Sequence, residues 1–327
     1  MGIRGMALLL AVLPLGTAGA QEGQAEPALQ EEDTVEVPRS QWEGSVELGA
    51  GYDTNANGST SVQSFLGFPL DPRYVATESS FAQAGFGVQH TLNLAPDRGF
   101  VSSMQLSHRV NPEASFADQS IVALGTEGII NRGASRFSAA IGGYASWLHG
   151  EGDERGANLD LNAAHEEDNV ATVFTLRLSR VDNDQREFAD LEVYRYLAAL
   201  SFTRSAIGSH AANVGLTFVS GHDSPLRRAS PFANDRLGVQ LSADWSVKEG
   251  IQAYIQLSGL RSDYRDPFFG FDRKDDQLSA AAAVEFTGWP GENWVLAPQV
   301  QYLRNDSTVF LFEYDRLEAV IYLRRAL

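Results

Sequence analysis

The chain has 327 residues, a formal net charge of −17 at pH 7 and no cysteine. The acidic balance argues against nucleic acid as a partner, and the lack of cysteine excludes disulfides as a source of stability. Hydrophobic residues make up 43% of the sequence. Beyond residue 20, however, no window approaches the roughly eighteen continuous apolar residues of a membrane-spanning helix. The apolar residues must therefore be distributed in another way.

The first twenty residues have the features of a secretory signal peptide. Arg4 supplies a positive charge, residues 6–15 form a short apolar run, and Ala18-Gly19-Ala20 has the small side chains of a cleavage site. The acidic segment 21–41 contains two prolines and is predicted to be a periplasmic linker. We therefore expect residues 1–20 to be removed on export and the folded domain to begin at residue 42.

Period-two alternation dominates the rest of the sequence. Over residues 237–247, Leu, Val, Leu, Ala, Trp and Val alternate with Gly, Gln, Ser, Asp and Ser. Residues 251–258 repeat the pattern after the tight turn Lys248-Glu249-Gly250. Two strands with one apolar and one polar face, joined by so short a turn, predict an antiparallel hairpin.

The same unit recurs along the chain and predicts fourteen strands. Short connections such as Pro96-Asp97-Arg98-Gly99 alternate with longer ones, the longest being 53–77, and acidic stretches such as 151–154 and 182–190 are read as solvated turns and loops. Short turns on one side and long loops on the other are typical of barrels in the outer membrane of Gram-negative bacteria. The predicted strands are 42–52, 78–93, 99–109, 118–129, 135–149, 155–165, 169–181, 191–203, 209–221, 235–247, 250–264, 276–287, 293–304 and 311–325.

The predicted fold is therefore an all-β, transmembrane, antiparallel up-and-down β-barrel over residues 42–327. A soluble β-sandwich also alternates apolar and polar residues. Strands of about 10–15 residues, however, exceed the usual length in globular proteins and match tilted membrane strands. Unpaired backbone groups in hydrocarbon cost several kcal/mol each, so the first strand must pair with the last. An even strand count places both ends on the periplasmic side.

The polar faces of the predicted strands are rich in Gln, Asn, Ser and Gly, which suits a water-filled lumen. Charged residues at membrane depth should also face the lumen, because the lipid face penalises them. They either line a conducting pore or pair across a plugged lumen, and the sequence favours neither alternative. The candidate lumen-lining residues are Gln105, Arg177, Gln240, Asp244, Gln252, Gln256, Glu285, Gln299, Gln301 and Glu318.

The segment Asp53-Thr54-Asn55-Ala56-Asn57-Gly58 matches the opening of an EF-hand loop. The bidentate acid of the twelfth position is absent, since Ser64 stands there, and the context is a strand and a loop. Asx turns at a strand end are the favoured interpretation, with Ca²⁺ binding as a minor alternative. We expect neither a metal nor a cofactor.

His222-Asp223-Ser224, with Asn234 downstream, is similar to the catalytic site of outer-membrane phospholipase. A serine nucleophile needs an adjacent base, and the base needs an orienting group. Ser224 is followed by Pro225-Leu226, where that family has Asn-Gly. A polar extracellular loop is therefore the favoured interpretation, with an outer-membrane hydrolase as a minor alternative, and we do not expect an enzyme.

Short motifs in a fixed order resemble the barrel domain of the surface lipoprotein assembly modifier proteins. The first is Trp42 followed by Gly-Tyr-Asp-Thr-Asn-Ala-Asn at 51–57. The others are Gly221-His222-Asp223, Ser230-Pro231-Phe232, Ser262-Asp263-Tyr264, Arg273-Lys274-Asp275, Ala297-Pro298-Gln299, Asn305-Asp306-Ser307, Glu313-Tyr314-Asp315-Arg316 and Leu323-Arg324-Arg325.

The resemblance implies a fourteen-stranded barrel that helps to deliver lipoproteins or other proteins to the cell surface. That family often carries a periplasmic helical-repeat domain before the barrel, for which residues 21–41 are too short, and its barrels usually end in Phe where this chain has Leu327. A passive porin-like channel for small solutes is the alternative function. The expected partners are outer-membrane lipids, the barrel-assembly machinery and, as cargo, surface lipoproteins or secreted proteins, and the barrel is expected to be a monomer.

Closure of the barrel should bring the first and last strands together at a seam, with its outer rim carrying the motifs of the resemblance. We therefore predict that this seam is the functional region and a candidate gate. Its candidate residues are Asp53, Asn55, Asn57, Asn305, Asp306, Ser307, Tyr314, Asp315 and Arg316.

Overall fold

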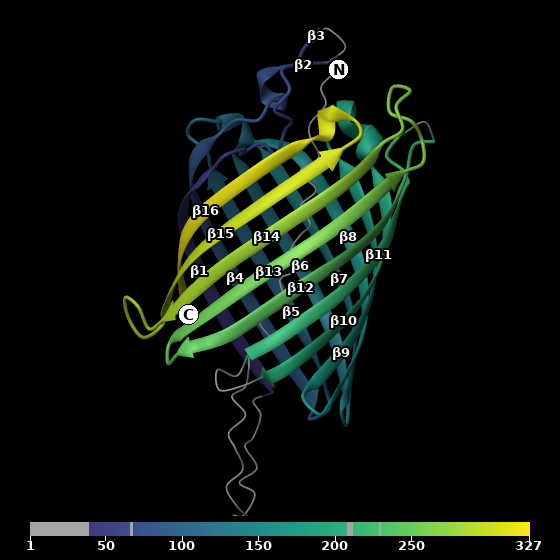
Figure 1. Cartoon of the computed structure of the whole chain (residues 1–327). Helices are drawn as coiled ribbons and strands as arrows, with labels where there is room; N and C mark the ends of the chain where they lie inside the picture. The colour runs from purple at the N-terminus through teal and green to yellow at the C-terminus, as the bar shows by residue number, and fades with distance from the viewer. Residues whose placement is uncertain (1–38, 66–67, 208–211, 229) are drawn as a thin grey trace, which may run out of the picture.

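In a computed structural model, fourteen antiparallel strands form one closed barrel (Figure 1). The structure describes residues 39–65, 68–207, 212–228 and 230–327. The predicted signal peptide 1–20 and all but the last three residues of the predicted linker 21–41 lie outside the described residues. Within the described part of the chain, no helix is long and apolar enough to cross a membrane.

Each strand of the barrel pairs with its neighbour in sequence, and the last strand pairs with the first. The strands are β1 (Ser40–Asp53), β4 (Ser79–Ala95), β5 (Arg98–Val110), β6 (Gln119–Arg132), β7 (Ser135–Leu148), β8 (Glu151–Glu167), β9 (Val170–Asn183), β10 (Val193–Ile207), β11 (Ala212–Pro225), β12 (Asn234–Lys248), β13 (Ile251–Tyr264), β14 (Lys274–Thr287), β15 (Trp294–Ser307) and β16 (Tyr314–Ala326). The predicted closure is confirmed, since β1 and β16 form a ladder from Ser45↔Ala326 to Asp53↔Glu318.

The predicted strands correspond one to one with these fourteen, and every boundary that falls on described residues agrees to within four residues. The predicted start at residue 209 lies outside the described residues. The alternation has the expected physical cause, since the apolar side chains point outward and remain exposed for lipid to cover. On β12, for example, Leu237 is 68% exposed, whereas the neighbouring even-numbered residues point to the lumen. The predicted all-β barrel is therefore confirmed, and its apolar surface lies outside rather than in a central core.

The prediction of a loop is wrong for two segments, because each is part of a strand. The acidic stretch 151–154 begins β8, and 222–225 ends β11. Between β7 and β8 only His149 and Gly150 remain as a turn, both with positive φ, of 50° and 81°. Both extensions lie at the end of the barrel that bears the longer loops, beyond the apolar band, where charged side chains are tolerated on either face.

The connections at the two ends of the barrel differ in length (Figure 1). Turns at the lower end in the figure are short, and longer loops gather at the upper end, which by the usual asymmetry is the extracellular one. The first long loop carries the short strands β2 (Ser64–Phe65) and β3 (Phe68–Pro69) and the 3₁₀ turn η1 (Pro72–Tyr74). Further 3₁₀ turns are η2 (Ser115–Ala117), η3 (Arg186–Leu191) and η4 (Phe310–Phe312).

A small apolar cluster joins four of the outer loops. We call it the loop core. Its buried members are Phe268, Val309, Leu311 and Phe312, and Leu70 and Phe232 pack against it. These residues come from the β1–β4, β11–β12, β13–β14 and β15–β16 connections. The loop core therefore ties the outer loops of that side of the barrel to one another.

Candidate functional site

The inner face of the barrel is identified by contacts between strands that are not neighbours. Arg109 of β5 donates to Glu318 of β16 (Nη1 to Oε2, 2.7 Å) and to Asp53 of β1 (Nη2 to Oδ2, 2.7 Å). Strands β4 and β1 separate β5 from β16 in the wall. The three side chains can therefore meet only inside the barrel. From these inward residues, the pairing registers show which residues of all the remaining strands face the lumen and which face outward.

By this register, all ten candidate lumen-lining residues lie on the inner face. Arg177 pairs there with Asp160 (Nε to Oδ1, 2.6 Å), and Glu285 accepts from Arg324 (Oε1 to Nη1, 2.8 Å). Three of the ten, Gln105, Asp244 and Gln252, are exposed although they point inward. Side chains that fill a small barrel would be buried, so the lumen has room for water beside each of these three side chains.

The nine candidate seam residues do not form one cluster. Asp53 and Arg316 meet at the seam, and Asn55 donates to the backbone oxygen of Asp315 (3.1 Å). Asn57 lies in the first loop, where it donates to the backbone oxygens of Arg73 and Val75. The others lie elsewhere: Asn305, Ser307 and Tyr314 near β14, with Asp306 paired to Arg304 on the outer surface.

Asp53, Arg109, Arg316 and Glu318 form a compact group of charges, the seam cluster. Asp53 is 0% exposed and accepts from Arg316 (Nη2 to Oδ2, 2.6 Å) as well as from Arg109. Glu318 also accepts from both arginines, at 2.8 and 2.7 Å. The Arg109 guanidinium lies 3.6 Å from the ring centre of Phe81. Two cations and two anions therefore neutralise one another and join β1, β5 and β16.

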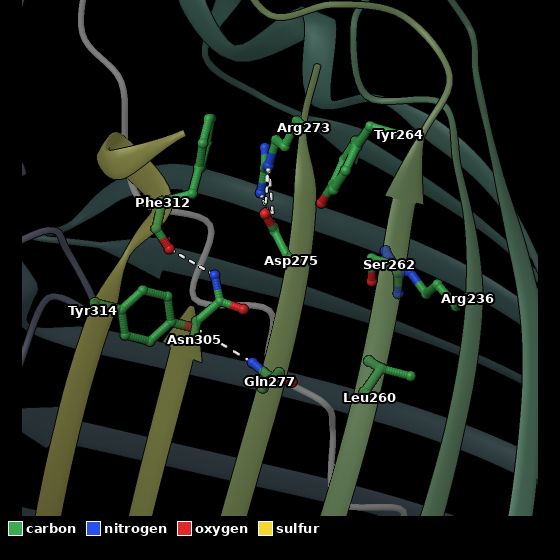
Figure 2. A pocket seen from close by; sticks show the side chains of 10 residues that line it. All are labelled: Arg236, Leu260, Ser262, Tyr264, Arg273, Asp275, Gln277, Asn305, Phe312 and Tyr314. Atoms are coloured by element: carbon green, nitrogen blue, oxygen red, sulfur yellow. Dashed lines mark hydrogen bonds and ion pairs between the residues drawn. The ribbon is translucent and has the colours of Figure 1, made fainter. Parts of the chain in front are cut away.

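A second group of charged and aromatic residues lies on the inner wall formed by β10–β16 (Figure 2). Asp223 is almost fully buried and accepts from Arg195 (Oδ1 to Nε, 3.0 Å) and from Arg236. Arg273, just before β14, donates to Asp275 (Nε to Oδ1, 3.0 Å). A cavity of about 30 Å³ lies beside Arg236, Arg273 and Asp275. We call it the wall pocket, and its lining includes Arg236, Tyr264, Arg273, Asp275, Gln277 and Phe312.

Sequence reasoning missed Arg109, Arg236 and Arg273. The only sequence signal for these three residues is a basic side chain on the polar face, at or beyond the outer end of a strand. That signal is weak. That pattern alone does not reveal partners on other strands. Arg273 lies within one of the motifs of the family resemblance, which implies no role for its side chain.

The minor interpretations as hydrolase and as EF-hand find no support in the geometry. His222 lies on the outer face, where its Nδ1 is 2.9 Å from Asp235, whereas Asn234 lies on the inner face and accepts from Arg236. Asp53 accepts from the backbone N–H of Asn55 (3.0 Å), which is the expected Asx turn. Both carboxylate oxygens of Asp53 also accept hydrogen bonds from Arg316. The described residues contain no group of three or more His, Cys, Asp or Glu suited to a metal.

Solved outer-membrane proteins share this architecture at low sequence identity. In-vitro folded OmpT, an outer membrane protein of Vibrio cholerae, has a TM-score of 0.50 and 8% identity, covering 90% of this chain and 100% of that one. The loop L8 deletion mutant of OmpT scores 0.47 at 10% identity, covering 89% and 100%. The outer membrane protein opdK from Pseudomonas aeruginosa scores 0.43 at 12%, covering 88% and 99%.

No protein-family model and no curated protein matches the sequence. The likeness therefore concerns the fold alone. With its closed set of fourteen strands and its outward apolar face, the chain has the architecture of an outer-membrane β-barrel.

Proposed function

We propose that this protein is a passive, porin-like channel for small polar solutes in the outer membrane of a Gram-negative bacterium. The observation that carries the proposal is the inward yet exposed position of Gln105, Asp244 and Gln252. Polar side chains that face the interior without filling it are those of a wetted lumen. The predicted signal peptide would direct the chain to export, and the function involves no covalent chemistry.

The width of the barrel supports the same function. About eight strands leave an interior just wide enough for side chains to fill, and the diameter grows with strand number. With fourteen strands, the interior is wider than its own side chains need. The charges of the seam cluster and of the wall pocket are paired with one another, so neither group presents an unpaired charge to the lumen. The channel is therefore proposed to select by size and polarity more than by charge sign.

Ion conductance across a planar lipid bilayer tests this proposal. The purified protein is expected to give stable unitary steps, and proteoliposomes that contain it should swell in small sugars more quickly than in large ones. A bilayer with correctly inserted protein but without conductance, together with proteoliposomes that do not swell, would exclude an open channel. Heat-modifiable migration on a gel is the control for insertion.

The second candidate is the translocator function implied by the family resemblance, and one observation favours it. The seam ladder between β1 and β16 pairs nine residues of β1, whereas the ladder between β1 and β4 pairs fourteen. A shorter ladder is the easier one to open sideways for cargo. Against this, Thr54 of the first loop exchanges two hydrogen bonds with Leu317, and the seam cluster joins both strands.

A disulfide across the seam separates the two functions. Ala50 faces Ile321 on β16 and Ala82 on β4, so Ala50→Cys with Ile321→Cys locks the seam, and Ala50→Cys with Ala82→Cys is a matched control. A translocator should lose surface exposure of lipoproteins, measured by protease accessibility, only with the oxidised seam pair. Unchanged exposure would exclude lateral opening, and a channel would conduct equally with either disulfide.

The remaining partners follow from the same proposal. Lipids are proposed to cover the apolar outer face, and the barrel-assembly machinery to insert the chain. The protein is proposed to act as a monomer, with protein cargo only in the translocator alternative. The mass of the purified protein in detergent, by light scattering with detergent correction, tests the monomer. A trimer would contradict it.

A further inference from the structure

We propose that the outer face of β13–β16 binds one glycerophospholipid at the periplasmic end of the barrel. An acyl chain would lie in an apolar groove, and the phosphate would bind Arg325. The site lies at the lower end of the barrel in Figure 1, where the β12–β13 and β14–β15 turns and the end of β16 are found. We call it the lipid groove. The inference does not depend on the proposed channel function.

The groove has a volume of about 470 Å³ and opens on the outer face of the wall. Its lining includes Ile251, Phe286 and Leu296. Phe286 lies opposite Ile251 on one side and Leu296 on the other, so the three side chains share a face. That face is the outer one, because the adjacent Glu285 points into the lumen. Trp289 of the β14–β15 turn also borders the groove and is 57% exposed. The groove therefore belongs to the surface that lipid covers.

Two glycines help to keep the groove open. Gly250 and Gly288 line it, and each turns the chain with a positive φ, of 73° and 81°. Most side chains would be strained in this conformation, and neither position contributes a side chain that could fill the groove. Ligand pockets have volumes of roughly 300–1,000 Å³. The volume, the apolar lining and the position at the membrane surface together suit a hydrocarbon chain.

Arg325 supplies an unpaired positive charge beside the groove. It faces outward, since the adjacent Arg324 points into the lumen and pairs there with Glu47 and Glu285. Among the described residues no carboxylate pairs with Arg325, and its guanidinium carbon lies 5.4 Å from the ring centre of Trp294. A guanidinium group can bind a phosphate through two parallel hydrogen bonds. An outward arginine beside a tryptophan at the membrane interface therefore favours a phosphate as its partner.

The strand register places Arg325 close to the groove and on its periplasmic side. Leu296 of the groove pairs with Leu323 of β16. Two residues nearer the periplasm, Trp294 pairs with Arg325. Two residues of a strand span about 7 Å, a distance that the glycerol backbone of a phospholipid can bridge. Glu249, an acid in the lining, lies in the β12–β13 turn and is separated from β16 by β13, β14 and β15. The phosphate is therefore expected at β16, with the acyl chain toward the centre of the bilayer.

The outer face at the opposite end of the same strands lacks this feature. Arg261 pairs there with Asp263, and Arg304 pairs with Asp306. Their charges are already neutralised by neighbouring carboxylates. The unpaired charge of Arg325 is therefore not a general property of outward arginines in this part of the wall.

Native mass spectrometry of the purified protein released from detergent micelles tests the phosphate contact. Dioleoyl phosphatidylglycerol and dioleoylglycerol are the probes, because they share their acyl chains and only the first carries a phosphate. The wild-type protein should bind the phospholipid about tenfold more tightly, the equivalent of one hydrogen bond to a charged group. Arg325→Gln should remove this difference by weakening the phospholipid alone. Both lipids are compared at the same detergent concentration.

The matched control is Arg132→Gln. Arg132 is also an exposed arginine on the outer face at the periplasmic end, but β1, β4 and β5 separate its strand from β16. Its replacement should leave the affinity for both lipids unchanged. Both substitutions lie at exposed positions, so both variants should fold, which heat-modifiable migration on a gel checks.

Tryptophan fluorescence tests the position of the acyl chain. One equivalent of phosphatidylglycerol with brominated acyl chains should quench Trp289 of the protein in micelles. The quenched fraction of the total fluorescence should therefore fall in Trp289→Phe. It should not fall in Trp147→Phe, since Trp147 lies near the opposite end of the outer face.

The proposal would be overturned by any of four results. These are no retention of phosphatidylglycerol by the wild-type protein, equal affinity for it in the wild type and Arg325→Gln, equal losses in Arg325→Gln and Arg132→Gln, and equal quenched fractions in the two tryptophan variants. Equal losses would show a general attraction to the rim, and equal quenching would place the acyl chain elsewhere. None of these measurements depends on conduction, so failure of the lipid groove would leave the proposed channel untouched.

Discussion

The seam cluster and the wall pocket both contain buried ion pairs between arginine and carboxylate side chains, but they differ in how completely their polar atoms are paired. In the seam cluster, Asp53 and Glu318 each accept from both Arg109 and Arg316. In the wall pocket, Arg273 leaves a nitrogen unpaired and Gln277 leaves an oxygen unpaired. The comparison teaches that burial and charge alone do not mark a binding site.

The two regions are therefore assigned different roles. The seam cluster joins β1, β5 and β16 and stabilises the closure of the barrel. The wall pocket holds two buried polar atoms, Arg273 Nη1 and Gln277 Oε1, without a hydrogen-bond partner among the described residues. The predictions that follow either strengthen or remove this contrast.

The largest expected effect is on the seam cluster. Asp53→Asn removes the buried carboxylate between two guanidinium groups and should lower the free energy of unfolding by about 4 kcal/mol, because uncompensated buried charges remain. Denaturant unfolding in lipid vesicles measures it. Asp306→Asn is the control, since its ion pair with Arg304 is exposed and should be worth less than about 1 kcal/mol. An equal loss of unfolding free energy in the two variants would show that the seam cluster does not stabilise the barrel.

The second effect concerns the loop core. Phe312→Ala should reduce the free energy of opening of the outer loops by about 3 kcal/mol, because a buried ring is replaced by a cavity. Native-state proteolysis of the loops measures the opening. Phe271→Ala, at a half-exposed ring in the β13–β14 loop, should change it much less, and a similar change there would contradict a specific loop core.

The third effect tests the assignment of faces on which the comparison depends. Gln105 and Leu106 are adjacent on β5, with Gln105 inward and Leu106 outward. Leu106→Lys should cost about 2 kcal/mol of unfolding free energy because the lysine meets lipid. Gln105→Lys should cost less than about 0.5 kcal/mol, since a lumen position is wet. A larger cost for Gln105→Lys than for Leu106→Lys would show that the inner and outer faces are assigned the wrong way round for the whole barrel.

The smallest expected effect lies in the β5–β6 loop. Hydroxyl groups of Ser79 and Ser80 donate to Glu113 and hold the pKa of its carboxyl below the usual value. The folded pKa is lowered, so this contribution to stability is present above the ordinary pKa of glutamate and is lost as the pH falls through the lowered one. Ser79→Ala should raise the pKa of Glu113, measured by ¹³C NMR titration. An unchanged pKa would show that these hydrogen bonds do not form.

Much of the fold could be predicted because lipid imposes one rule on every strand. An apolar side chain at every second position, as in 237–247, is what a membrane wall requires. The prediction failed at 151–154 and 222–225, where the wall extends past the hydrocarbon and the rule no longer applies. The inner positions of the ten lumen candidates follow from the same alternation. That Arg109 meets Glu318 across two strands depends on strand tilt and closure, which no local pattern encodes.

The wall pocket could not be predicted for a related reason. Arg273 and Gln277 are close in sequence, but the feature that distinguishes them is that each has a buried polar atom without a hydrogen-bond partner. That property depends on where Tyr264, Phe312 and Asp275 lie in the folded barrel.

The most direct test of a water-filled lumen is the response of single-channel conductance to a charged thiol reagent at Gln105→Cys. The chain has no native cysteine, so the label is confined to the introduced residue. A cationic methanethiosulfonate should reduce the conductance at Gln105→Cys in a single step and leave that of Leu106→Cys unchanged. Complete labelling of Gln105→Cys, verified by mass spectrometry, without any change in conductance would contradict a conducting lumen.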